Sequence, residues 1–389
     1  MKSAKNWGQS GMKCELSDIC IYRKGKIDVS FLNTQTYIST ENMLNNKGGV
    51  TTATSLPSIA QTQNYLEGDV LVSNIRPYFK KIWQAKFDGG CSNDVLVFTA
   101  KENTDNDFLY YVLADDAFFN YAMATSKGTK MPRGDKTSIM KYEVPCYDIK
   151  MQKKVVSVLR SIDDKIELNN SINNNLEQQA KAIFENEFLS LQSLPNGWKQ
   201  ASLIDIADYI NGLAMQKYRP SADEIGIPVL KIKELRQGCC DDNSELCSPS
   251  IKSNYIIHDG DVIFSWSGSL LVDFWCGGIC GLNQHLFKVT SSKYDKWLYY
   301  TWTKHHLERF IAVAADKATT MGHIKRDDLA KAEILIPNEA DYNRIGTLLQ
   351  PIYDLIISNR IENNNLADLR DTLLPKLMSG ELDVSDIEI

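Results

Sequence analysis

The sequence predicts an α+β protein. We expect two similar α/β domains, with mixed and mainly antiparallel strands, separated by two long helices that form an antiparallel coiled coil. Three observations support this prediction. A heptad pattern occurs twice in the chain, and short segments recur in the same order in both halves. In addition, 389 residues are too many for one core and fit two domains of about 150 residues plus long helices.

The two long helices are expected in segments 149–190 and 338–380. In each segment, apolar and amide residues alternate at steps of four and three, which is the a/d seam of a coiled coil. The expected helix–helix seam residues are Leu159, Ile162, Ile166, Asn169, Asn173 and Leu176 in the first helix, and Leu349, Ile352, Ile356, Asn359, Asn363 and Leu366 in the second. Pro195 and Gly197 follow the first helix, and the second is expected to end near Pro375.

Four asparagines in the middle of the seam predict how the helices pair. Short connections and the need to return the second domain favour an antiparallel arrangement. One antiparallel register pairs Asn169 with Asn363 and Asn173 with Asn359. An unpaired buried amide costs about 1–3 kcal/mol, so this register should be unique. The alternative is a loosely packed seam in which these asparagines face solvent.

The two domains, 1–148 and 195–337, contain matching segments. Each opens with an apolar residue pair around an aspartate, has a Gly-Asp turn leading into a buried strand, and continues with a second strand, a short helix and a closing strand. In order, these segments are 16–19, 67–73, 93–97, 109–111 and 142–145 in the first half, and 203–206, 259–265, 283–287, 298–300 and 332–337 in the second. The tyrosines of the short helices lie beside Leu and Phe, which favours a place in the core and at its rim over base stacking.

Between the short helix and the closing strand, each half has a basic loop. The loops are 126–136 and 316–326, and both combine Thr, Lys and Arg with glycine. Such a loop can offer backbone N–H groups and cations to phosphates while a side chain reaches a base edge. Either loop alone could be an ordinary solvated loop, but its recurrence at the same place favours a function.

Composition limits the other possibilities. The net charge of −6 argues against nucleic-acid binding on average, although acidic residues crowd the helices and the tail 381–389 while basic residues gather in the loops. We find no signal peptide and no apolar run of the length that a bilayer requires, so we expect a cytoplasmic protein without membrane contact. The nine cysteines show no paired framework, which predicts free thiols. A zinc site at Cys239, Cys240, Cys276 and Cys280 fits no standard ligand spacing.

The sequence contains no enzyme signature that we recognise. A Walker loop, the Asn-Pro-Pro-aromatic tetrapeptide of amino-methyltransferases, a dinucleotide-binding glycine fingerprint and a helix with two histidines around a glutamate are all missing. His305 and His306 are adjacent and point to different faces of a predicted helix, so they do not suit a shared metal. We therefore predict no catalytic residue, no metal and no cofactor.

Three segments together resemble one known family, the specificity subunit of type I restriction-modification enzymes. They are Leu-Pro-Asn-Gly-Trp at 194–198, Gly-Thr-Lys-Met-Pro-Arg-Gly-Asp at 128–135, and Leu-Leu-Pro-Lys-Leu-Met-Ser-Gly-Glu-Leu at 373–382. The resemblance covers essentially the whole chain. Two positions depart from it: Gly322 stands where the family often has proline, and the first half has only Asn-Trp-Gly at 6–8 as its entry.

The resemblance implies a non-catalytic subunit of a bacterial defence system. Each domain would be a target-recognition domain that reads one half of a bipartite double-stranded DNA target. The helices would set the spacing and seat two methyltransferase subunits, and restriction subunits would join through the complex. The alternatives are a two-domain coiled-coil adaptor for proteins, without DNA specificity, and a methyltransferase, which the missing tetrapeptide disfavours.

The residues expected to contact DNA lie mostly in the strand-end and basic loops. Arginine and lysine would hold phosphates or guanine edges, and the smaller polar residues would read adenine edges or anchor the backbone. These residues are Arg76, Lys127, Thr129, Lys130 and Arg133 in the first half, and Lys217, Arg219, Ser267, Thr320, His323, Lys325 and Arg326 in the second.

Overall fold

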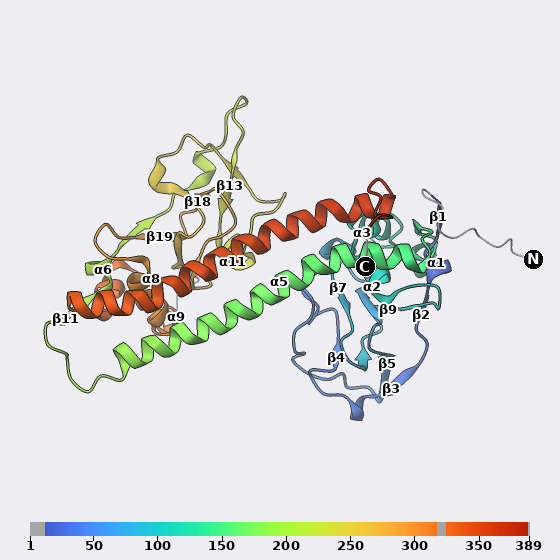
Figure 1. Ribbon diagram of the computed structural model, residues 1–389, viewed down its shortest axis with the longest axis horizontal. Coiled ribbons are helices and arrows are strands. Elements are labelled where there is room, and N and C mark those ends of the chain that lie inside the picture. The colour runs from blue at the N-terminus through green and yellow to red at the C-terminus, as the bar shows by residue number, and fades with distance from the viewer. Residues whose placement is uncertain (1–11, 129, 317–323, 388–389) are drawn as a thin grey trace, which may run out of the picture. The chain divides into compact units, whose positions relative to one another are not determined.

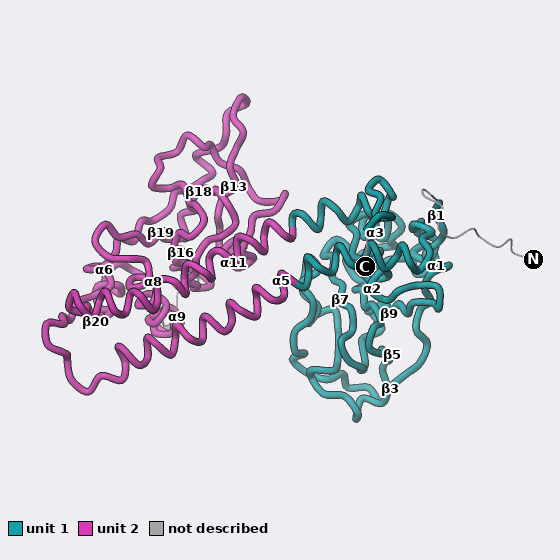
Figure 2. The backbone as a smooth tube through the Cα atoms, in the orientation of Figure 1, with its two compact units in different colours: residues 1–164, 368–389 teal, residues 165–367 magenta. Residues whose placement is uncertain are grey.

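The computed structural model describes residues 12–128, 130–316 and 324–387 (Figure 1). The chain divides into two compact units, residues 1–164 with 368–389 (unit 1) and residues 165–367 (unit 2) (Figure 2). Both long helices are shared between the units. Helix α5 (Ile149–Phe184) begins in unit 1 and ends in unit 2, whereas α11 (Glu339–Ser379) begins in unit 2 and ends in unit 1.

Unit 1 contains two four-stranded sheets and a two-stranded ribbon. Among the described residues of this unit, all strand pairs are antiparallel except β4 with β8. In spatial order, the sheets are β2 (Cys20–Tyr22), β9 (Val95–Ala100), β6 (Val70–Ser73) and β7 (Ile82–Gln84); β3 (Lys26–Asp28), β5 (Gln61–Tyr65), β8 (Gly89–Cys91) and β4 (Tyr37–Ile38); and the ribbon β1 (Lys13–Glu15) with β10 (Glu143–Pro145). The helical elements are α1 (Leu16–Ile19), η1 (Val29–Phe31), η2 (Pro77–Phe79), α2 (Asn106–Ala114), α3 (Asp116–Ala124) and α4 (Lys136–Ile139).

The core of unit 1 follows from the alternation of side chains along β6. Val70 and Val72 pack with the helices, including Phe108 of α2, while Leu71 points to the other face and packs with Tyr65 of the second sheet. The run of apolar residues in β6 therefore has both faces buried. This explains why the strand reads as continuous and not alternating in the sequence.

Unit 2 repeats this plan. The sheets are β12 (Asp208–Asn211), β19 (Leu286–Thr290), β16 (Val262–Ser265) and β17 (Leu271–Phe274); β14 (Leu246–Cys247), β13 (Ile227–Leu230), β18 (Cys280–Leu282) and β15 (Ile256–Ile257); and the ribbon β11 (Lys199–Ser202) with β20 (Glu333–Ile336). The helical elements are α6 (Leu203–Ile206), η4 (Met215–Lys217), α7 (Ile232–Gln237), η5 (Ser253–Tyr255), α8 (Lys296–His305), α9 (Leu307–Asp316) and α10 (Arg326–Ala330). The units differ at the edge of the second sheet, where β3 extends unit 1 beyond β5 and β14 extends unit 2 beyond β13.

Within unit 2, the end of α5 and the beginning of α11 pair antiparallel in the expected asparagine register. The Asn169 amide donates to Asn363 Oδ1 at 2.9 Å, and the Asn359 amide donates to Asn173 Oδ1 at 2.8 Å. Asn169, Asn173 and Asn359 are at most 8% exposed, so the solvent-facing interpretation is wrong for these three. Of the other seam residues, Leu159, Ile162, Leu349 and Ile356 are buried, and Ile166, Leu176, Ile352, Asn363 and Leu366 are half-buried.

The end of the second helix differs from the expectation. Helix α11 continues through Pro375 to Ser379, and Gly380 follows with φ 77°. Proline within a helix costs about 3 kcal/mol. Leu374, Leu377 and Met378 are buried in the core of unit 1, and each such side chain contributes about 1.5–3 kcal/mol. Burial of the last turn therefore outweighs the lost hydrogen bond.

The first long helix ends where the sequence predicts. Helix α5 continues into a π-helical turn at Glu185–Leu189, and the helical segment ends there.

Candidate nucleic-acid interface

In unit 1, the loop after β6 and the basic loop are joined by backbone hydrogen bonds. Arg76 N donates to Pro132 O at 2.9 Å, and Gly134 N donates to Asn74 O at 3.2 Å. Lys127 and Arg133 exchange backbone hydrogen bonds at 2.9 and 3.0 Å, which closes the basic loop into a hairpin. The structure thus brings together Arg76, Lys127 and Arg133, with Lys130 exposed near the hairpin tip. Thr129 lies outside the described residues.

Two of these cations, Lys127 and Arg133, form ion pairs with carboxylates of unit 1. Arg133 Nη2 lies 3.1 Å from Asp94 Oδ1, and Lys127 Nζ lies 2.5 Å from Asp135 Oδ2. The hydrogen bond from Lys127, together with the one from Ser138 N, lowers the pKa of Asp135 to about 2. Both pairs are partly exposed, so a phosphate oxygen can replace either carboxylate at little cost. The loop therefore holds its cations in place before any ligand arrives.

Unit 2 has the same junction with different side chains. Ile324 N donates to Trp266 O at 3.0 Å, as Gly134 N does to Asn74 O in unit 1. This bond brings Lys325 and Arg326, both exposed at the start of α10, to the loop that contains Ser267. Thr320, His323 and Gly322 lie outside the described residues.

Gln284 and His285 lie next to this junction, and neither was predicted as a site residue from the sequence. The buried Ser267 hydroxyl lies 3.1 Å from His285 Nδ1, and His285 Nε2 lies 3.2 Å from the Gln284 amide. Both follow Asn283 in the shared segment before β19. The repeat marks that segment, but only the fold shows that its polar end meets Ser267.

Lys217 and Arg219 are not brought to this junction by any contact between described residues. Lys217 ends η4, and Arg219 Nη2 lies 3.2 Å from Glu245 Oε2 beside β14. Both residues are among the DNA contacts expected from the sequence. Arg219 instead lies at the edge of the second sheet, where its Nη1 also donates to Leu246 O of β14 at 3.5 Å.

Two further cations, Lys47 and Lys80, gather beside Arg76 in unit 1. Asn46 N donates to Phe79 O and Lys47 N to Lys80 O, each at 2.9 Å. Both ammonium groups pair with Asp116, at 3.0 Å for Lys47 and 2.6 Å for Lys80. Burial alone would raise the pKa of Asp116, but the two lysines lower it overall. The sequence Asn-Asn-Lys-Gly-Gly at 45–49 is typical of a turn, but its pairing with residues more than thirty positions later depends on the tertiary structure.

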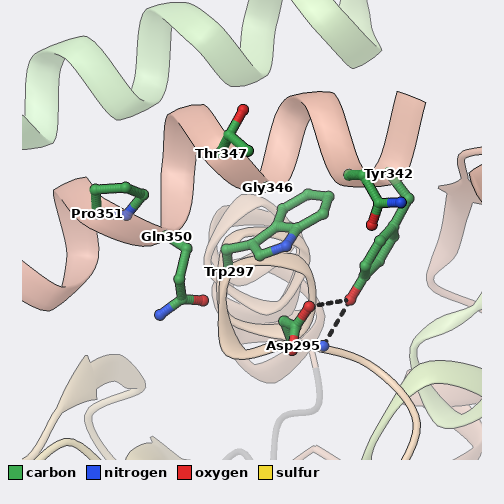
Figure 3. Close-up of a pocket in the computed structure, with 8 residues that line it drawn as sticks. Asp295, Trp297, Tyr342, Gly346, Thr347, Gln350 and Pro351 are labelled. Carbon is green, nitrogen blue, oxygen red and sulfur yellow. Dashed lines mark hydrogen bonds between the residues drawn. The ribbon is translucent and has the colours of Figure 1, made fainter. Parts of the chain in front are cut away.

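The cavity in Figure 3 lies elsewhere in unit 2, between the start of α8 and α11. Its volume is about 290 Å³, and Trp297, Tyr342 and Gly346 are among its lining residues. The Tyr342 hydroxyl donates to Asp295 Oδ2 at 3.0 Å, and burial raises the Tyr342 pKa. The carboxylate and the phenol thus satisfy each other. This lining contains no arrangement typical of a catalytic centre.

The histidine and cysteine residues noted in the sequence have structural environments. His306 Nε2 lies 2.8 Å from Glu333 O, and burial lowers the pKa of both His305 and His306. Burial raises the pKa of the Cys276 thiol to about 12. Within the described ranges, no group of three or more His, Cys, Asp or Glu side chains is placed to hold a metal. Nor is any helix there long and apolar enough to cross a membrane.

Comparison with known proteins gives one consistent family. The family model described as type I restriction modification DNA specificity domain matches residues 10–178 and 195–367. The chain is 26% identical to the type I restriction enzyme MjaIX specificity subunit of Methanocaldococcus jannaschii, over 74% of this chain and 71% of that protein. It is 21% identical to the HindI specificity subunit of Haemophilus influenzae, over 94% and 98%. The type I restriction-modification S subunit from M. genitalium has a similar fold, with a TM-score of 0.55 at 13% identity over 97% and 98% of the two chains.

Proposed function

The chain belongs to the type I restriction-modification DNA specificity family, and from this membership we propose that it is the non-catalytic DNA-recognition subunit of such a complex. Unit 1 and unit 2 each read one half of a bipartite target. The observation that carries the proposal is the junction between a strand-end loop and a basic segment, which occurs at the same place in both units. The target-recognition domains correspond to 1–148 and 195–337, with 149–190 and 338–380 as spacer helices and 381–389 as the acidic tail.

The chemistry of the junction supports DNA as the ligand. Its cations are exposed or paired with partly exposed carboxylates, and the half-buried side chains of Gln284 and His285, the latter positioned by the buried Ser267, can bond to base edges. The overall charge of −6 is no obstacle, because local clusters of cations and not the sum determine where a polyanion binds. We propose Arg76, Lys127, Thr129, Lys130, Arg133, Ser267, Thr320, His323, Lys325 and Arg326 as the contacting set, with Lys217 and Arg219 at its margin.

The long helices are proposed to seat two methyltransferase subunits and to set the spacing between the half-sites. Restriction subunits then join through the complex, which acts in the cytoplasm. Exposed leucines on the helices support a protein partner: Leu168 of α5 is 54% exposed, and Leu348 and Leu355 of α11 are 44% and 45% exposed. Leu348 and Leu355 are seven residues apart and share one face of α11, which is the spacing of apolar anchors on a helix that binds a protein partner.

A gel-shift experiment tests the proposal against the adaptor alternative, which the family match disfavours. The full chain, alone and with a methyltransferase subunit, is titrated with random-sequence duplex and with duplex selected by repeated binding. We expect salt-sensitive binding to both and tighter binding to the selected pool. Assembly with the methyltransferase subunit but no DNA binding at any salt concentration would favour the adaptor.

A further inference from the structure

The two units place a left-handed backbone at the same position of the recognition loop. Arg76 is the fourth residue of the loop that begins at Ser73, and its φ is 50°. In unit 2, the loop begins at Ser265, and its fourth residue is Gly268 with φ 65°. The backbone therefore has a positive φ at this position in both copies. Unit 2 meets this requirement with glycine, and unit 1 meets it with arginine.

Arginine is a costly residue at such a position. Glycine adopts a positive φ freely, whereas a side chain with a Cβ meets the carbonyl oxygen that follows it. Backbone bonds hold Arg76 in place: its N–H donates to Pro132 O at 2.9 Å, and its carbonyl accepts from Phe79 N at 3.0 Å. The strain thus persists because the surrounding loops determine the conformation, as at many ligand-binding positions.

No polar contact of the Arg76 side chain with another described residue offsets this strain. The Arg76 side chain is half-buried, and its Nε is buried without a hydrogen-bond partner. No described residue forms an ion pair with its guanidinium group. Lys127, Arg133 and Lys80, in contrast, each have a carboxylate partner. A strained residue with an unsatisfied side chain indicates a ligand that is absent from the free protein.

We propose that Arg76 determines specificity in unit 1 by reading the edge of one guanine through Nη1 and Nη2. This inference rests on the proposed function and adds a base and a residue to it. With Nε buried, the two terminal nitrogens remain, and their spacing matches the O6 and N7 acceptors of guanine in the major groove. Phosphates occur all along DNA, so a side chain that binds a phosphate does not need one fixed direction. A base edge has one position, and a side chain that reads it must point in that direction. The strained backbone at Arg76 fixes the direction of the side chain.

The test uses Arg76→Gly in the full chain assembled with its methyltransferase subunits. Because glycine suits the positive φ, the variant should keep its Tm or gain about 2–4 °C. Affinity for the wild-type target should fall about 10- to 100-fold, with loss of preference at one G·C pair of the first half-site. Sequencing of methylated DNA reads that preference directly, and the second half-site should not change.

Two matched variants distinguish the role of the guanidinium group from the role of its charge and from the effect of a side chain on the turn. Arg76→Lys keeps the charge without the planar fork, so it should lose the same base preference while it retains binding to random duplex. Gly268→Arg imposes the strained residue on unit 2 and should lower the Tm by about 2–4 °C.

The possible results are distinct. A Tm several degrees lower in Arg76→Gly would show that the arginine serves the fold, and an unchanged base preference would show that it does not read the base; either result overturns the inference. Absence of any sequence preference in the unmodified complex would overturn the proposed function instead.

Discussion

At the scale of single residues, the exposed lysines of the two junctions should act through phosphates. Lys130 and Lys325 lie on the exposed part of each junction, where a cation gains most from the DNA backbone. Replacing either by alanine should weaken binding to all duplexes about equally and reduce the slope of log K against log salt by roughly one. Fluorescence anisotropy titrations over a salt series measure this slope. A changed sequence preference with an unchanged slope would contradict the prediction.

The Lys127–Asp135 pair should influence both DNA affinity and acid stability. Asp135 competes with phosphate for Lys127, and it also caps α4 by accepting from Ser138 N at 2.9 Å. Asn at the same place keeps the cap and removes the charge, so Asp135→Asn should bind every duplex more tightly. Asp135 has a pKa of about 2 in the folded state, below its ordinary value of about 3.9.

The sign of the pH effect follows from this depressed pKa. The carboxylate stabilises the fold above about pH 4, and this contribution is lost as the pH falls through 2. Urea unfolding between pH 5 and pH 2 should therefore show a shallower decline for Asp135→Asn than for the wild type. Parallel declines in the two proteins would show that the ion pair adds nothing to stability.

At the scale of elements, the asparagine layers of the helix pair should behave as coupled units. Asn173 and Asn359 are both buried and bonded to each other, so replacing Asn173 by leucine leaves the Asn359 amide unpaired. That should cost about 1–3 kcal/mol, whereas leucine at both positions should cost less than the sum of the single changes. Denaturant unfolding of the four proteins gives the coupling. The exposed Asn174→Ala is the control, and additive effects would contradict the prediction.

The helices also show how far the sequence leads. The asparagine register was predictable for two reasons. A heptad seam can be read from the spacing of residues within one helix, and a shifted antiparallel register would leave buried asparagine amides unpaired. The end of α11 could not be predicted in this way. Leu377 and Met378 stabilise the turn beyond Pro375 because they pack in a core formed by segments distant in the sequence. The same limit applies to the interface. The repeat located Arg76 and the basic loops, but the hydrogen bonds from the turn at Asn46 and Lys47 to Phe79 and Lys80, and the separation of Arg219 from Ser267, depend on tertiary structure.

At the scale of the whole molecule, each unit should determine its own half-site independently of the other. The core of unit 1 combines residues of the domain, such as Phe108 and Leu109, with Val155 and Leu377 of the long helices. Exchanging residues 16–142 for the matching segment of a relative that keeps this apolar contact should change the first half-site and leave the second unchanged. Methylated-DNA sequencing distinguishes the two. Altered recognition at both half-sites would contradict independent reading.

The spacing proposal leads to a prediction about insertions in the helices. A single insertion after Ala180 is unsuitable, because Ala180 and Phe184 lie in the core of unit 2. A matched insertion of one heptad in each helix, after Lys165 and after Ala367, keeps the a/d phase on both sides and leaves the two asparagine layers intact. Seven helical residues add about 10 Å, or roughly three base pairs at 3.4 Å each. The unread gap between the half-sites should therefore lengthen by about three base pairs while both half-site sequences are retained.

A four-residue insertion in the same places is the control. It breaks the heptad phase and should abolish methylation. An active seven-residue variant with an unchanged gap would show that the helices do not set the spacing.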